Sequence, residues 1–135
     1  MMDFNSILIF SEEPEKLAGF YKNVFEKEPE WGGGGYYGFK IGGGFITIGL
    51  HDKVKGKSKN PERIMINFET DNVRSEFKRV EKLGAKVIAK PYSMTEREDE
   101  DEGMLIATFA DPDGNYFQLV SPWQESEEDS KNDLN

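Results

Sequence analysis

Short apolar segments, several with strict alternation of apolar and polar residues, occur at seven places along the chain. In the first, Ile7 and Ile9 fall on one face, and Ser6, Leu8 and Phe10 fall on the other. A period of two is typical of half-buried β-strands. The expected strands span residues 5–10, 36–41, 45–50, 64–70, 86–89, 104–109 and 116–120.

Two other segments carry apolar residues at the spacing of an amphipathic helix. The first spans residues 14–26 and begins with Pro14, which suits a first helical turn. Asp71 or Asn72 is placed to cap the second, and Gly84 follows it where a left-handed residue is favoured. The two apolar stripes are Leu17, Phe20, Tyr21, Val24 and Phe25, and then Val73, Phe77, Val80 and Leu83.

The order of these elements repeats. A shift of 59 residues places Ile7 on Ile66 and Ile9 on Phe68, and each half is expected to run as strand, helix and three strands. Each half alone would expose the apolar side of its sheet, so the halves should pack as one unit. We therefore expect a single domain over residues 1–123, with modules at about 4–60 and 61–123, followed by a disordered acidic tail at 124–135.

Three motifs make the chain resemble the vicinal oxygen chelate superfamily, which includes glyoxalase I, extradiol dioxygenases and bleomycin resistance proteins. They are Phe20-Tyr21 in the first helix, residues 80–85 at the end of the second, and residues 109–115 (Phe-Ala-Asp-Pro-Asp-Gly-Asn) before Gln118. The resemblance implies a glyoxalase-like α+β fold, with two βαβββ modules forming a curved mixed sheet around a pocket. It also implies a homodimer.

Enzymes of this superfamily chelate a divalent metal at four positions, which correspond here to Ser6, Thr47 (or Gly49), Met65 and Gln118. None of these side chains is an imidazole or a carboxylate, the donors that zinc, iron and manganese favour. We therefore expect that the metal site has been lost, and we expect no cofactor.

The alternation also predicts which side chains face the pocket. This face mixes aromatic and apolar walls with a few polar groups, as small-molecule pockets do. A ligand-free interior filled by the same side chains is the alternative. The predicted substrate-binding residues are Ser6, Leu8, Phe10, Phe45, Thr47, Met65, Asn67, Tyr116 and Gln118.

Two functions remain open. The first is a metal-free, bleomycin-resistance-like protein that binds a small aromatic or amphipathic molecule. The second is a lyase, isomerase or dioxygenase-type enzyme of the same superfamily with an atypical metal site or with metal-free acid–base chemistry. Candidate catalytic groups for the second are Glu69, Tyr116 and His51, the last beside Asp52 at a strand end.

The composition excludes several kinds of site and partner. The chain has 135 residues, no cysteine and one histidine, so it holds no disulfide, thiolate metal site or cysteine nucleophile. Its net charge is −9, and eleven of its 26 acidic residues lie in 96–102 and 124–135, so we expect no nucleic-acid partner. No apolar run is long enough to span a membrane, and no secretory signal is evident, so we expect a cytoplasmic protein.

Three further features have more than one interpretation. Gly33-x-Gly35-x-x-Gly38 has the letters of a dinucleotide motif but precedes strands, so we interpret it as a loop. Trp31 is either a lid over the pocket or a cover for the sheet edge. The alternate lysines at 53–59 either attract an anionic ligand, pair with the acidic loop of a partner subunit, or keep an edge strand soluble.

Overall fold

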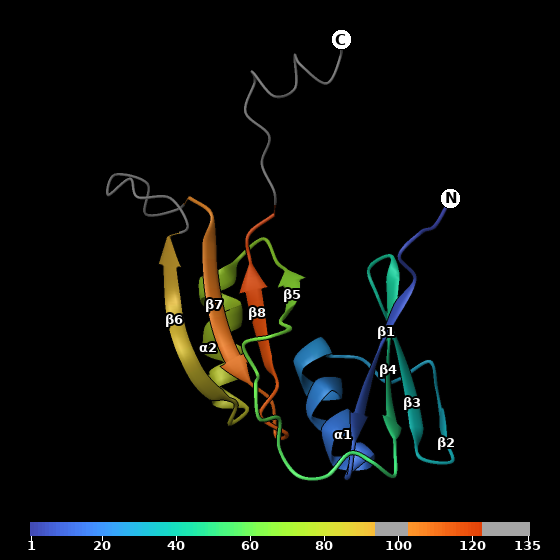
Figure 1. Ribbon diagram of the computed structural model, residues 1–135. Helices are drawn as coiled ribbons and strands as arrows, with labels where there is room; N and C mark the ends of the chain where they lie inside the picture. Colours follow the sequence, from blue (N-terminus) through green and yellow to red (C-terminus); the bar gives the residue numbers. More distant parts are fainter. Residues whose placement is uncertain (94–102, 123–135) are drawn as a thin grey trace.

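The computed structural model describes residues 1–93 and 103–122; the acidic segment at 96–102 and the acidic tail at 124–135 lie outside this part. The described chain forms a β-α-β-β-β unit twice (Figure 1). Module 1 consists of β1 (Ser6–Ser11), α1 (Pro14–Phe25), β2 (Trp31–Gly33), β3 (Tyr36–Ile41) and β4 (Gly44–Leu50). Module 2 consists of β5 (Ile66–Glu69), α2 (Val73–Lys82), β6 (Lys86–Ser93), β7 (Leu105–Ala110) and β8 (Tyr116–Val120).

Each module builds one four-stranded mixed sheet. Sheet A has the strand order β1-β4-β3-β2, and sheet B has the order β5-β8-β7-β6. In each, the first and last strands of the module pair in parallel, and the other neighbours are antiparallel. The α+β class and the two βαβββ modules are confirmed, but the sheet is divided, because its hydrogen bonding stops at β1 and at β5.

Two strands differ from the expectation. The glycine motif that begins at Gly33 was interpreted as a loop, but Trp31–Gly33 pairs with β3 as β2. The strand predicted to end at Ala89 continues through Pro91 to Ser93. Proline is tolerated there because β6 is an edge strand that pairs only with β7, and the pairing shifts register twice before Tyr92.

The helices begin and end close to the predicted residues. Pro14 occupies the first turn of α1, and the Ser11 hydroxyl accepts a hydrogen bond from the Glu13 amide at 3.0 Å. Asn72 caps α2, with its side-chain oxygen 3.0 Å from the Ser75 amide nitrogen. Gly84 follows α2 with a φ of 92°, as its position after the helix predicts.

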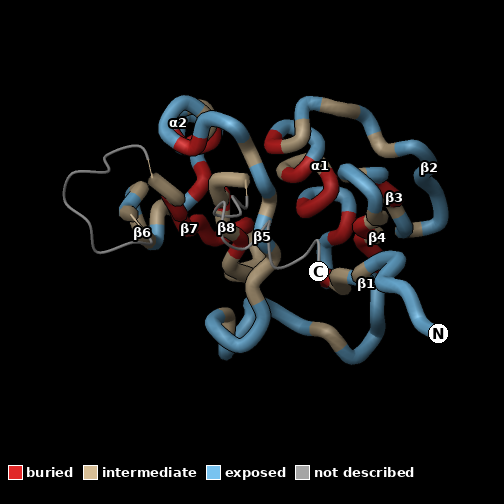
Figure 2. The backbone as a smooth tube through the Cα atoms, turned by 90° about the horizontal axis from the view of Figure 1, so that it is seen from above, coloured by how far each residue is buried: buried red, intermediate tan, exposed pale blue. Residues whose placement is uncertain are grey.

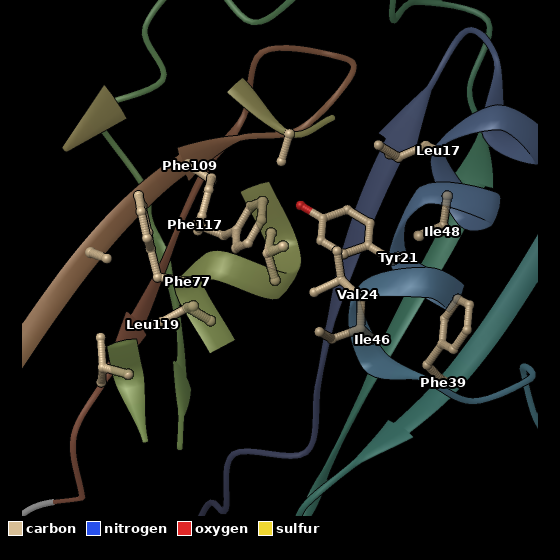
Figure 3. Close-up of a cluster of buried hydrophobic side chains, with 14 of the residues drawn as sticks. Leu17, Tyr21, Val24, Phe39, Ile46, Ile48, Phe77, Phe109, Phe117 and Leu119 are labelled. Carbon is tan, nitrogen blue, oxygen red and sulfur yellow. The ribbon is translucent and has the colours of Figure 1, made fainter. Parts of the chain in front are cut away.

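Both helices cover the same side of the sheets, and the apolar core lies between (Figures 2 and 3). Tyr21 of α1 points toward Phe117 of β8, with ring centroids 5.7 Å apart. Phe25 of α1 meets Phe68 of β5 at 5.1 Å. Side chains from module 1 therefore pack directly on module 2, and one aromatic core joins the two.

Polar contacts reinforce this junction. The Arg79 guanidinium on α2 donates to the carbonyl oxygens of Val24 (2.6 Å) and Asn23 (3.0 Å) at the end of α1, and it is held by Glu76 at 2.8 Å. Helix carbonyls that would otherwise lack partners are thereby satisfied. No helix among the described residues is long and apolar enough to cross a membrane.

Candidate functional site on the open faces of the sheets

The surface of each sheet opposite its helix is here called its open face. On sheet A, cross-strand pairing aligns Leu8 with Thr47, Thr47 with Gly38, and Gly38 with Trp31. Side chains directly opposite one another in a sheet share a face. The open face of sheet A therefore presents one row that runs across all four strands.

Two aromatic rings of this face lie over glycines. A Cβ atom at Gly38 would come within 2.3 Å of the Trp31 indole, and one at Gly49 would come within 2.4 Å of the Tyr36 ring. Only glycine leaves room for such close packing on a strand. Gly38 on β3 and Gly49 on β4 are diagonal neighbours, about 7 Å apart, so the two rings lie over adjacent strands of the same face.

These rings remain partly accessible. Trp31 is 47% exposed, Tyr36 is 38% exposed and Leu8 is 56% exposed. The Tyr36 hydroxyl donates to the Leu50 carbonyl oxygen at 3.3 Å, which fixes its ring over β4. We call Trp31, Tyr36 and Leu8 the aromatic platform. Trp31 lies on the edge strand β2, with its indole over Gly38 of the neighbouring strand β3. Tyr36 was not among the predicted site residues.

The open face of sheet B is different. Asn67, Gln118 and Thr108 form its central row, and the Gln118 side-chain amide donates to the Thr108 hydroxyl at 2.9 Å. Thr108 is only 4% exposed. The central row of this face thus holds a satisfied polar pair, and its exposed ring, Tyr92, lies opposite Ile106 and not over a glycine.

A groove lies between the two sheets, at the edges of β1 and β5. It has a volume of about 460 Å³. Ile7 and Phe45 line it from module 1, and Met65, Asn67 and Phe68 line it from module 2. Three predicted substrate-binding residues, Phe45, Met65 and Asn67, therefore meet in one apolar groove.

The other predicted residues are distributed differently. Tyr116 lines a separate cavity at the start of β8. Ser6, Leu8, Phe10, Thr47 and Gln118 lie on the strands as the alternation predicts, but they line neither of these two cavities.

The four positions that correspond to metal ligands do not fit a transition metal. Thr47 and Ser6 offer hydroxyls, Met65 a thioether, and Gln118 an amide that already binds Thr108. Zinc and iron sites use imidazole, thiolate or carboxylate donors. Within residues 1–93 and 103–122, no group of three His, Cys, Asp or Glu residues is placed to hold a metal ion.

The candidate acid–base groups are not brought together. Glu69 pairs with Val120 at one end of β8, and Tyr116 begins the strand at the other, about 13 Å away. His51 follows β4, packs edge-on against Phe10 and accepts a hydrogen bond from the Lys53 amide through Nδ1 at 3.1 Å. The same nitrogen lies 3.3 Å from Asp52, but while it accepts from Lys53 it has no proton for that carboxylate.

Asp111 has a structural role in the turn that carries the most specific sequence motif. Its carboxylate accepts hydrogen bonds from the amides of Asp113 (2.9 Å) and Asn115 (3.0 Å), from the Asn115 side chain, and from the Tyr21 hydroxyl (2.7 Å). Burial raises the pKa of Asp111, against the opposing effect of these bonds. Burial, followed by the nearby Asp111 charge, raises the pKa of Tyr21. The Asp-Pro-Asp-Gly turn is therefore anchored to α1.

In each βαβββ module the first and last strands pair in parallel, and both helices lie on one side of the sheets. Two such modules together make a glyoxalase-type fold. A family model described as a glyoxalase-like domain matches residues 6–120, and the chain belongs to this family. A comparison with curated protein sequences gave no match.

Solved structures with the same fold share little sequence. A glyoxalase-related enzyme from Fulvimarina pelagi has a TM-score of 0.71 at 15% identity, with 96% of each chain covered. A glyoxalase/bleomycin resistance protein/dioxygenase family enzyme from Burkholderia phytofirmans PsJN has a TM-score of 0.69 at 19% identity, covering 89% of this chain and 98% of its own. A lactoylglutathione lyase from Agrobacterium tumefaciens has a TM-score of 0.65 at 18% identity, with 88% and 92% covered. At these identities the similarity establishes the fold alone.

Proposed function

We propose that this glyoxalase-like protein is a small-molecule-binding protein that has lost the metal-chelating residues of the superfamily. Its ligand is flat and largely apolar, and it stacks on the aromatic platform of sheet A. The observation that carries the proposal is the pair of part-exposed rings, Trp31 and Tyr36, each packed closely over a glycine. A ring held in place by the sheet loses little side-chain entropy when a ligand stacks on it.

The groove between the sheets supports the same ligand class. Its volume of about 460 Å³ lies within the range of small-molecule sites, and its lining is mostly apolar. Leu8 and Phe45 belong to the same open face of sheet A, so the platform and the groove are joined by β1 and β4. A ligand with two apolar parts would contact both.

A direct test uses 2-naphthol, a flat and neutral probe, with the full chain in isothermal titration calorimetry. We expect a Kd in the sub-millimolar range, weakened about tenfold or more when Trp31 and Tyr36 are both replaced by alanine. Tyr92→Ala is the matched control, because Tyr92 is a 49% exposed ring on β6. No binding to the native protein, or an equal loss in Tyr92→Ala, would contradict the proposal.

The enzyme alternative makes a different prediction. A lyase or isomerase with an atypical metal site would retain zinc, nickel, iron or manganese at near one ion per chain after purification, as measured by elemental analysis. Metal-free acid–base chemistry would use Glu69, Tyr116 or His51, and an activity that survives Glu69→Gln would remove Glu69 from the mechanism.

We also propose a homodimer in the cytoplasm. Among the described residues the outer edge of β1 pairs with no other strand, so its backbone groups can pair with a strand of a second copy. Sedimentation equilibrium of the full chain would give twice the monomer mass of 15.4 kDa for a dimer. A monomer at micromolar concentration would rule the dimer out.

A further inference from the structure

A second cavity lies at the end of sheet B, away from the aromatic platform. It has a volume of about 520 Å³. Lys86, Ala110 and Tyr116 form the last row of the sheet there, in direct cross-strand register. In Figure 1 this is the lower end of sheet B, where β7 ends and β6 and β8 begin, and where the segment connecting the modules passes in front of β8.

The connecting segment closes one side of this cavity and brings Lys57 to it. It is fixed by a hydrogen bond from the Ser58 amide to the Asp113 carbonyl oxygen at 2.8 Å. Next to this bond, the Lys57 side chain packs on Gly114, where an added Cβ atom would lie 3.6 Å from Lys57 Cβ. Lys57 and Lys86 therefore enter the same cavity from two separately anchored segments.

Neither lysine has an acidic partner in the part of the chain that the structure describes. Among the described residues, no carboxylate lies within 4 Å of the ammonium group of Lys57 or of Lys86, although the protein carries an excess of nine negative charges. Asp111 also lines the cavity, but it is 5% exposed and its oxygens already accept four hydrogen bonds. The groups free to bind a ligand are thus two cations and the Tyr116 hydroxyl.

The remaining wall is apolar, with Leu83 and Ile88 among the exposed side chains that contribute to it. We infer that this cavity is a binding site for a small amphipathic anion, whose carboxylate or phosphate group lies between Lys57 and Lys86 and whose hydrocarbon part covers Leu83 and Ile88. The site is separate from the aromatic platform, so this inference does not depend on the proposed function.

Octanoate is a suitable probe, with octyl phosphate as a second anion and octanol as the uncharged counterpart. Titration of the full-length, ¹⁵N-labelled protein should shift backbone amide signals around Lys57 and Tyr116. Octanol should bind about tenfold more weakly than octanoate, because it lacks the charge that the two lysines contact. The relative affinities of octanoate and octyl phosphate identify the head group.

The double variant Lys57→Gln/Lys86→Gln should weaken octanoate binding about tenfold, and so should 0.5 M salt in the native protein. Lys53→Gln is the matched control, because Lys53 lies in the same connecting segment but does not line the cavity. Unchanged amide signals elsewhere would show that the double variant is folded. Equal binding of octanol, full affinity in the double variant, or shifts confined to the region of Trp31 would each overturn the inference.

Discussion

The two modules have the same β-α-β-β-β order and the same sheet topology, yet their open faces differ in chemistry. Sheet A presents the part-exposed rings of Trp31 and Tyr36, packed over glycines. Sheet B presents a hydrogen-bonded Gln118–Thr108 pair, with Thr108 buried. The sides that pack against the helices are apolar in both modules, while the sides that face away from the helices differ. The side facing the helices therefore specifies the fold, and the open faces are where function is to be sought.

The largest effect on stability is expected from a substitution in the core, which tests whether both modules depend on one shared core. Phe117 is fully buried and contacts Tyr21 of module 1 as well as Phe109 of module 2. Phe117→Ala should lower the free energy of unfolding by about 3–5 kcal/mol, because it removes a large side chain from a close-packed site. Urea unfolding followed by circular dichroism should show a single transition. Two separate transitions would mean that the modules fold independently.

The next effect concerns the junction between α1 and the turn before β8. Because burial raises the pKa of Asp111, the folded state holds this proton to a higher pH than the unfolded chain. The stability advantage of the native protein over Asp111→Asn should be largest below about pH 3.9 and fall as the pH rises toward the pKa of the folded state. It should change by about 1.4 kcal/mol for each unit that separates the two pKa values.

Urea midpoints of both proteins across pH 3–7 measure this difference, and the contributions of the other carboxylates cancel between them. If the stability difference between the two proteins grew with rising pH, the prediction would be contradicted. That result would show that the fold stabilises the Asp111 carboxylate in its charged form.

A smaller effect separates the two open faces. Gly38→Ala places a methyl group where the Trp31 indole lies, so the ring must move away, and we expect a loss of about 1 kcal/mol in stability together with weaker 2-naphthol binding. Gly19→Ala on α1 is the control, because no atom lies within 4 Å of its added Cβ and it lies outside both the platform and the groove. Equal naphthol affinities in the two variants would show that the platform does not bind the ligand.

The smallest expected effect is on sheet B. Thr108→Val keeps the shape of the side chain but removes the hydroxyl that accepts from Gln118, so stability should fall by about 1 kcal/mol or less. Naphthol binding should be unchanged, because Thr108 lies on the other sheet. A loss of affinity in Thr108→Val would show that the ligand spans both open faces.

The sequence alone was sufficient to predict the helices and strands and to identify the residues that face the helices. Leu17, Tyr21 and Val24 recur at helical spacing and are buried, and Ile7 and Ile9 alternate toward the core as expected. These patterns are local, so they can be recognised without knowing the register between strands.

The platform could not be predicted in the same way. Trp31 lies over Gly38 and Tyr36 over Gly49 only because of the cross-strand register, which depends on where β2 and β3 turn. Gly38 and Gly49 are single glycines inside predicted strands, and their role as the floor beneath a ring became visible only in the folded sheet. For the same reason, alternation placed Tyr116 on the open face but did not show that it lies at the far end from the groove.

The most direct test of the central claim observes Trp31 itself. In a Trp123→Phe variant, Trp31 is the only tryptophan, so its indole N–H gives a single side-chain signal in an ¹⁵N-labelled protein. The account predicts that 2-naphthol shifts this signal in a saturable manner, with the same Kd as calorimetry gives. An indole signal that stays in place while naphthol binds elsewhere would contradict it.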